Sequence, residues 1–300
     1  MKIKIFKSVR NFFLIIFIQF LRFFFLFIPW RIGTTIGKFL GYICFYFFKK
    51  EKGIIYKNLD IVYKGQLSLK EKEKFAKENF KNYGIGLVEF IKFTLWKPEK
   101  IAGLVKKVEG IEYFEKAFSE KKGIIAVTGH FSNWEIIPQY FAYKGYNIGV
   151  IGKSLFDERL NNIVNRTRQK GGVKVFDRDK ISKDMIKELK NGMFLGVLVD
   201  QDTKVESKII NFLGKPAKTP VAPVLLAQKF NCYLLTLFSL RMEDGYYKII
   251  INKPFDNIIN TAVEKLAEKY NNEISAIILK YPYQWAWIHN RWKSVEEHRG

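Results

Sequence analysis

The stretch GIIAVTGHFSNWEII, residues 123–137, decides the fold and points to the functional site. Its first half consists of small and β-branched apolar residues, which predicts a buried strand. His130 follows that strand directly, and Ser132 or Asn133 is expected to cap a helix that carries Glu135. The chain has only 3 histidines in 300 residues. A rare titratable side chain at the end of a buried strand therefore marks a candidate site.

Apolar runs and amphipathic stretches alternate from about residue 105 onward. This alternation predicts an α/β fold with a mostly parallel central sheet flanked by helices. The last two strands are expected to be antiparallel, because only a short turn with Gly245 separates them. The predicted strands are residues 123–129, 147–152, 173–176, 194–200, 233–240 and 246–252, and the predicted helices are residues 133–144, 158–169, 182–190, 221–229 and 261–279.

The N-terminal segment FFLIIFIQFLRFFFLFIPW, residues 12–30, is almost continuously apolar. Its length suits a membrane-spanning helix. Gln19, Arg22 and Pro29 weaken insertion, and a helix lying in the membrane interface is the alternative. A third interpretation makes this segment and the shorter apolar patch after it two buried core helices. Attachment to a membrane by an N-terminal hydrophobic anchor helix is the interpretation we favour.

This reading divides the chain into two parts. Residues 1–50 are expected to form a membrane anchor with interfacial helices. Residues 51–300 are expected to form a catalytic domain. Helices with charged outer faces are predicted between residues 49 and 93, and Ser68 with Glu71 resembles a capping box there.

The balance of 51 basic against 29 acidic residues gives a net charge of +22. Such a charge attracts nucleic acid, an anionic membrane surface or an acidic protein. The basic residues are dispersed and no nucleic-acid-binding module is recognisable, which argues against nucleic acid. Two cysteines, Cys44 and Cys232, provide neither a disulfide framework nor the ligand spacing of a zinc site. We expect no metal.

His130 and Glu135 form a candidate catalytic pair. Five positions on a regular helix separate two side chains by roughly 140°, so the pair requires His130 to lie in the turn before the helix. An imidazole held by a carboxylate has a fixed tautomer and greater basicity, as a general base needs. No nucleophile stands beside His130, so we expect it to deprotonate a substrate hydroxyl that attacks an activated acyl group. A structural histidine at a strand end remains the alternative.

Four blocks of the chain resemble the bacterial lipid A biosynthesis acyltransferases, the late lauroyl and myristoyl transferases. The first is VEGIEYFEKAFSEKKGIIAVTGHFSNWEI, residues 108–136. Similarity continues through residues 166–192 and 197–229 and ends in YPYQWAWIHNRWK, residues 281–293. The blocks occur in the family's order. The resemblance implies a glycerolipid-acyltransferase-like fold.

The resemblance also implies an activity. Family members transfer a fatty acyl group from acyl carrier protein to a hydroxyl of a Kdo-containing lipid A precursor, at the cytoplasmic face of the bacterial inner membrane. It makes His130 the general base and Glu135 its orienting partner. Acyl carrier protein, the glycolipid acceptor and an anionic membrane surface are the implied partners, and no cofactor is needed beyond acyl carrier protein as co-substrate. Another glycolipid or lysophospholipid acceptor and a non-catalytic membrane scaffold are the alternatives.

Further candidates for substrate binding are Arg168, Arg178, Asp200, Asp202 and Asn133. Arginine binds phosphate through a bidentate fork, and the implied acceptor carries phosphate. The two aspartates close an apolar strand and emerge at the edge of the sheet where the site is expected. They are interpreted either as groups that orient an arginine or the substrate hydroxyl, or as loop caps.

Two other segments are given structural roles. Thr219 is expected to cap a helix that has Pro220 at its first position. His289 stands among three tryptophans, and we expect a packed aromatic closure or an interfacial belt there.

Overall fold

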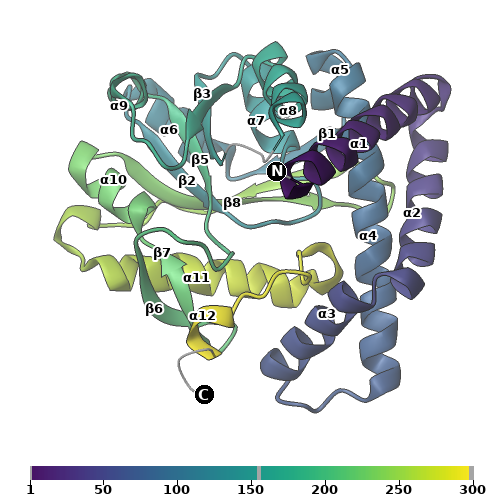
Figure 1. The fold of residues 1–300 in the computed structure, drawn as a ribbon. Helices are drawn as coiled ribbons and strands as arrows, with labels where there is room; N and C mark the ends of the chain where they lie inside the picture. Colours follow the sequence, from purple (N-terminus) through teal and green to yellow (C-terminus); the bar gives the residue numbers. More distant parts are fainter. Residues whose placement is uncertain (1, 154–156, 297–300) are drawn as a thin grey trace.

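The structure is a computed structural model that describes residues 2–153 and 157–296 (Figure 1). Its centre is a seven-stranded sheet in the order β1-β9-β8-β2-β5-β3-β4. Neighbouring strands are parallel except β8 and β9, which are antiparallel as predicted. The strands are β1 (Val105–Glu109), β2 (Ile124–Thr128), β3 (Ile148–Gly152), β4 (Lys174–Asp177), β5 (Phe194–Leu198), β8 (Tyr233–Arg241) and β9 (Tyr247–Ile251). The predicted α/β fold with a mostly parallel sheet is confirmed.

Helices cover both faces of the sheet because its central strand is apolar on both sides. In β2, Ile124 and Ala126 face a core formed with α6 and α7, whereas Ile125 and Val127 face a core formed with α9, α10 and α11 (Figure 1). A strand buried on both faces reads as a continuous apolar run, which is the signal seen in the sequence. The helices that follow the first strand are α6 (Ile111–Ser119), α7 (Ile136–Tyr143), α8 (Glu158–Lys170), α9 (Lys183–Lys190), α10 (Ala222–Phe230), α11 (Val263–Lys280) and α12 (Lys293–Glu296).

A separate two-stranded hairpin, β6 (Ser207–Phe212) and β7 (Lys215–Pro220), precedes α10. Leu213 and Gly214 both have positive φ, as a tight hairpin turn requires. Thr219 lies within β7, where its Oγ1 accepts a hydrogen bond from Asn271. The predicted cap at Thr219 is therefore wrong, and α10 begins only at Ala222.

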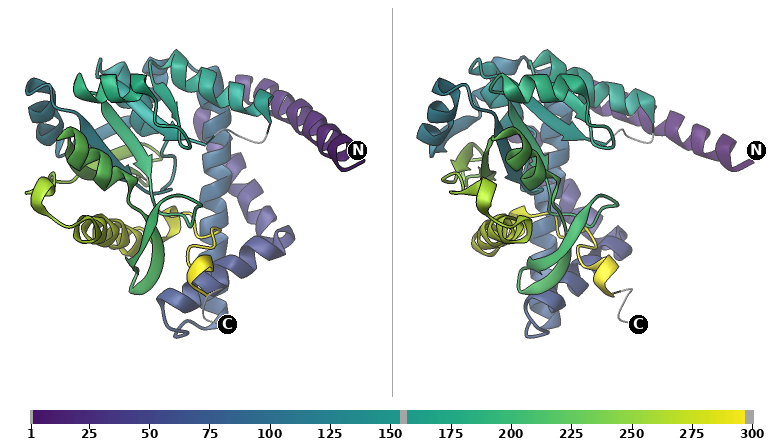
Figure 2. Two further views of the ribbon diagram at one scale, coloured as in Figure 1. Left: turned by 60° about the vertical axis from the view of Figure 1, so that its left-hand side comes forward. Right: turned by 90° about the vertical axis from the view of Figure 1, so that its left-hand side faces the viewer.

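Five helices precede the sheet: α1 (Lys2–Phe27), α2 (Trp30–Phe47), α3 (Lys49–Val62), α4 (Leu69–Leu95) and α5 (Pro98–Ala102). The predicted capping box is confirmed, since Ser68 and Glu71 bond reciprocally at the start of α4. Helix α1 extends away from the rest of the molecule (Figure 2). Within the described ranges, no helix is both long enough and apolar enough to cross a membrane.

Helices α2 and α4 approach each other at backbone distance. A Cβ added to Gly84 would lie 2.0 Å from the carbonyl oxygen of Gly37, and one added to Gly41 would lie 2.2 Å from that of Phe80. Only glycine permits this contact. The buried Lys92 of α4 passes Gly33 of α2 and donates from Nζ to the carbonyls of Phe25 and Ile28, at the end of α1.

Candidate active site

His130 and Asp200 meet because two neighbouring parallel strands end at the same edge of the sheet. Thr128 at the end of β2 pairs with Leu198 at the end of β5, and each of the two site residues comes two positions later. His130 Nδ1 lies 2.7 Å from Asp200 Oδ1, and the His130 backbone N–H donates to Oδ2 at 2.7 Å. A carboxylate thus fixes both the ring and the backbone of His130.

Asp200 is buried, with 1% of its surface exposed. Burial alone would raise its pKa, but the charge of His130 and hydrogen bonds from His130 and from the Trp285 indole outweigh burial, and the pKa of Asp200 lies well below its usual range. The ionised carboxylate accepts a hydrogen bond from Nδ1–H of His130. The proton therefore stays on Nδ1, and Nε2 is the basic nitrogen. Gly129 leaves room for this contact, since a Cβ there would lie 3.0 Å from Asp200 Oδ2.

Glu135 does not hold His130. Helix α7 begins at Ile136, so Glu135 precedes its first turn instead of lying within it. Its carboxylate accepts two hydrogen bonds from Arg168 of α8, from Nε at 2.9 Å and from the terminal nitrogen at 2.5 Å. The orienting carboxylate of His130 is therefore Asp200, and the contact predicted between His130 and Glu135 is wrong. Burial would lower the pKa of Arg168, but the bonds to Glu135 raise it.

Ser132 and Asn133 do not cap α7 either, which corrects a second prediction. Ser132 has a φ of 44°, and its hydroxyl donates to Gln284 Oε1 at 2.5 Å. The turn is consequently longer than the sequence indicated. Pro138 has no N–H and fits the first turn of α7, where no intrahelical donor is needed.

A cavity of about 520 Å³ opens in front of His130. One part of its lining is basic and comes from Lys153, Arg168 and Arg178. Another part is apolar and includes Phe90, Ile151, Val164, Ile181, Met185 and Leu226. The cavity therefore combines an anion-attracting region with an apolar region beside one imidazole, as a site for a charged lipid would.

The other candidate residues lie in different surroundings. Arg178 lines the cavity and pairs with Asp179 at 3.2 Å. Asp202 accepts hydrogen bonds from the backbone and hydroxyl of Ser294, at 2.8 Å each. Asn133 is buried and faces Glu89 at 3.5 Å, on the far side of the turn from the cavity. The structure thus brings His130, Glu135, Arg168, Arg178 and Asp200 together and places Asp202 and Asn133 elsewhere.

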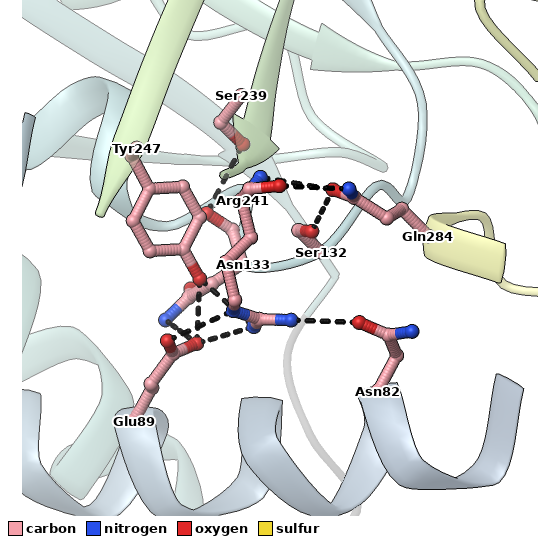
Figure 3. Close-up of polar contacts among 8 residues, drawn as sticks. All are labelled: Asn82, Glu89, Ser132, Asn133, Ser239, Arg241, Tyr247 and Gln284. Carbon is pink, nitrogen blue, oxygen red and sulfur yellow. Dashed lines mark hydrogen bonds and ion pairs between the residues drawn. The ribbon is translucent and has the colours of Figure 1, made fainter. Parts of the chain in front are cut away.

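A buried polar network supports the turn from behind (Figure 3). Arg241 at the end of β8 contacts both carboxylate oxygens of Glu89 on α4, at 2.7 and 3.2 Å. The Tyr247 hydroxyl donates to Glu89 at 2.6 Å and accepts from Arg241 at 2.9 Å, and Arg241 also donates to Asn82 at 2.8 Å. Burial raises the pKa of Tyr247 far above its usual value, so its hydroxyl stays a donor.

The C-terminal segment of residues 281–293 pairs with the turn that carries His130 as a short strand would. The Ser132 N–H donates to the Gln284 carbonyl at 2.7 Å, and the Ala286 N–H donates to the His130 carbonyl at 3.0 Å. Phe131 and Trp285 form an isolated antiparallel bridge between these bonds. Trp285, Trp287 and Trp292 are buried, which confirms the packed aromatic closure and not an interfacial belt.

Gln201 escaped the sequence interpretation, and His289, which was given a structural role only, lies beside it at the site. Gln201 Nε2 lies 3.0 Å from His130 Nε2 and 2.7 Å from His289 Nε2. Burial, together with the nearby His130, lowers the pKa of His289 to about 4. Gln201 directly follows Asp200, so its position next to a candidate acid was the available signal. In the part of the chain that is described, no group of three or more His, Cys, Asp or Glu side chains is placed to hold a metal ion.

Comparison with known proteins gives a consistent result. Residues 3–294 match the family described as bacterial lipid A biosynthesis acyltransferase. The chain is 26% identical over 273 residues to a lipid A biosynthesis lauroyltransferase of Escherichia coli, covering 90% of this chain and 88% of that protein. It is 24% identical over 278 residues to the palmitoleoyltransferase of that organism, with 89% and 87% covered. The chain is also 22% identical over 222 residues to the lipid A biosynthesis myristoyltransferase of Escherichia coli, and the match covers 73% of this chain and 68% of that protein.

Proposed function

The chain belongs to the bacterial lipid A biosynthesis acyltransferase family, and from this premise we propose that it transfers a fatty acyl group from acyl carrier protein to a hydroxyl of a Kdo-containing lipid A precursor. Membership makes it an acyltransferase that acts in lipid A biosynthesis. The donor, the acceptor hydroxyl and the roles of individual residues are the proposal. The three relatives are named for three different acyl groups, so we assign no chain length.

One observation carries the mechanism: His130 has an ionised, buried aspartate on Nδ1 and lines the cavity. In the proposed reaction Nε2 takes the proton of the acceptor hydroxyl while the oxygen attacks the thioester carbonyl. Asp200 holds the tautomer and stabilises the imidazolium that forms. When the tetrahedral intermediate collapses, the C–S bond breaks and the thiol of the carrier leaves with the proton.

Glu135 acts in this proposal through Arg168 and not through His130. Its two hydrogen bonds fix the guanidinium at the cavity wall, close to Arg178 and Lys153. Three cations around one cavity suit an acceptor that carries phosphate. The apolar part of the cavity suits the acyl chain, since each buried methylene contributes about 0.8 kcal/mol. We propose that Asn133 and Asp202 maintain the turn and the C-terminal segment without contacting substrate.

We further propose that the protein works on the cytoplasmic face of the inner membrane, with residues 1–50 as the attachment. Helices α1 and α2 expose many large apolar side chains, among them Phe17, Phe23, Phe27 and Phe47, at 55–76% of their surface. Exposed apolar area of this kind marks an interaction surface. The net charge of +22 favours an anionic leaflet and an acidic carrier protein.

The test uses the full-length protein purified in mild detergent. It is incubated with acyl carrier protein charged with chains of about 10 to 16 carbons, so that donors of different length are compared in the apolar part of the cavity, and with a Kdo-bearing tetra-acylated lipid A precursor. Mass spectrometry is expected to show a gain of one acyl chain in the acceptor, absent with His130→Ala and without acceptor. Transfer that survives His130→Ala would refute the general base. A folded protein inactive with every donor on this acceptor, yet active on another glycolipid or a lysophospholipid, would refute the acceptor class.

A further inference from the structure

The side-chain amide of Gln201 lies between two imidazoles at the site. Its nitrogen is 3.0 Å from Nε2 of His130, 3.3 Å from Nδ1 of the same ring and 2.7 Å from Nε2 of His289. The two rings are 5.4 Å apart between centroids. Because it is almost equally far from both ring nitrogens of His130, the amide nitrogen lies over the face of that ring, and both residues line the cavity.

The protonation states of the two rings decide which way the amide points. His130 donates Nδ1–H to the Asp200 carboxylate, so its Nε2 presents a lone pair. His289 is neutral near pH 7, because burial lowers its pKa to about 4, and with its proton on Nδ1 its Nε2 accepts. A carboxamide nitrogen carries two hydrogens, so one bonds to His289 Nε2 and the other stays available over the His130 ring, whereas the carboxamide oxygen cannot donate to His289.

The backbone fixes both flanking groups. Gln201 follows Asp200, whose carboxylate is held by His130 and Trp285. The carbonyl of His289 accepts a hydrogen bond from Asn58 Nδ2 of α3 at 2.8 Å. The groups on both sides of the amide are therefore held in place, and His289 fixes the amide beside the base.

The substrate hydroxyl and the amide occupy different places at His130. A hydroxyl that gives its proton to Nε2 approaches to about 2.6–3.2 Å in the plane of the ring, so the amide over the ring face does not have to leave. The amide N–H groups then lie next to the reacting carbon. Negative charge develops there on the former carbonyl oxygen, and donors of this type stabilise it.

We propose that Gln201 is a further catalytic residue, whose amide N–H groups stabilise the oxyanion of the tetrahedral intermediate and are held in readiness by His289. The inference rests on the proposed function. In the step concerned, the acceptor oxygen bonds to the thioester carbonyl carbon, its proton moves to His130 Nε2, and the carbonyl π electrons move to the oxygen facing Gln201. Collapse restores the C=O bond, and the thiolate leaves with that proton.

Gln201→Ala removes both donors without adding charge. We expect kcat to fall about 10²–10³-fold, as for the loss of one oxyanion donor, while KM changes by no more than about threefold. Gln66→Ala is the matched control, because Gln66 is exposed in the turn after α3. It should retain the activity of the wild type. Thermal unfolding checks that both variants fold.

Gln201→Glu keeps the shape and replaces the donor with a carboxylate beside His130. A second negative charge stabilises the protonated imidazole, so the acid limb of the kcat profile should move to higher pH. A residue remote from His130 would not move that limb. Gln66→Glu adds the same charge far from the site and should leave the profile unchanged.

The outcomes separate this inference from the proposed function. If the wild type transfers acyl chains and His130→Ala does not, the function stands whatever Gln201 does. Under that condition, Gln201→Ala with a kcat equal to or higher than that of the wild type overturns the inference. A raised KM with unchanged kcat overturns it as well, since Gln201 would then contribute only to binding. An inactive wild type would count against the proposed function instead.

Discussion

Two arginine–glutamate pairs flank the turn that carries His130, and they differ in almost everything except their chemistry. Behind the turn, Arg241 and Glu89 expose 7% and 0% of their side chains, and Tyr247 hydrogen-bonds to both (Figure 3). In front of it, Arg168 and Glu135 expose 17% and 16% and line the cavity. The first pair is enclosed by protein and the second faces the space where substrate would enter.

The difference indicates a division of labour. A buried pair contributes when every donor and acceptor has a partner, and its loss leaves an uncompensated charge. The polar groups around Glu89 meet this condition. The pair at the cavity keeps its charge accessible, so Arg168 retains donor capacity for an anionic group. We therefore expect the buried pair to govern stability and the cavity pair to govern substrate use.

The largest expected effect separates the two carboxylates near His130. Asp200→Asn should lower kcat about 10³–10⁴-fold, because an amide no longer holds the productive tautomer. Glu135→Gln should reduce kcat/KM by about 10- to 100-fold, mostly through KM, as the loss of a charge-assisted bond would. Steady-state kinetics of acyl transfer measure both. The opposite ranking would restore Glu135 as the partner of His130.

Stability should rank the two ion pairs in the reverse order. Glu89→Gln leaves Arg241 buried without its counter-charge, and we expect the free energy of unfolding to fall by about 3–5 kcal/mol. Glu135→Gln at the cavity should lower it by on the order of 1 kcal/mol. Urea unfolding in detergent, followed by tryptophan fluorescence, gives both values. Equal losses would remove the distinction drawn between the pairs.

Acid should reveal the buried state of His289. Its folded pKa of about 4 lies below the unfolded value, so the unfolded chain binds the extra proton between these two pH values. Stability is therefore lost as pH falls from about 6.5 to 4, by up to about 3 kcal/mol. In His289→Asn this part of the pH dependence should disappear. An unchanged slope in the variant would show that other groups cause the loss.

The smallest expected effect tests the fit of Asp200 against the strand end. Gly129→Ala places a Cβ 2.9 Å from Phe131 and 3.0 Å from Asp200. We expect a loss of about 1–3 kcal/mol in unfolding free energy from overpacking, together with reduced activity. Gly53→Ala at an exposed position of α3 is the matched control, because no other part of the structure lies within 4 Å of its added Cβ. That control should be neutral or stabilising by up to about 1 kcal/mol.

Much of the sheet was predictable because buried parallel strands read as short apolar runs. The missed strand β1, with the sequence VKKVE, is an edge strand whose two lysines hide its pattern. The hairpin β6–β7 was missed because Pro216 and Pro220 argue against a strand. Both errors lie where a strand has an unpaired side, since the tertiary surroundings decide the structure there.

The site was only partly predictable for a different reason. Rarity and position identified His130, but its partner Asp200 comes from another strand, and the register of two strands is not visible in residue spacing. Glu135 was the nearer carboxylate in sequence and was chosen for that reason. Glu89 was invisible because a charge on an amphipathic helix normally faces water. Only packing shows that it faces inward.

The glycine contact between α2 and α4 has a mechanical consequence. Where Gly84 of α4 touches Gly37 and Gly41 of α2, no side chain stands between the two backbones whose rotamer could absorb a displacement, so the helices move together at this contact. Helix α4 also holds the end of α1 through Lys92 and the turn of His130 through Glu89, three positions apart along its axis. A tilt imposed on α1 and α2 would therefore also displace the turn that carries His130.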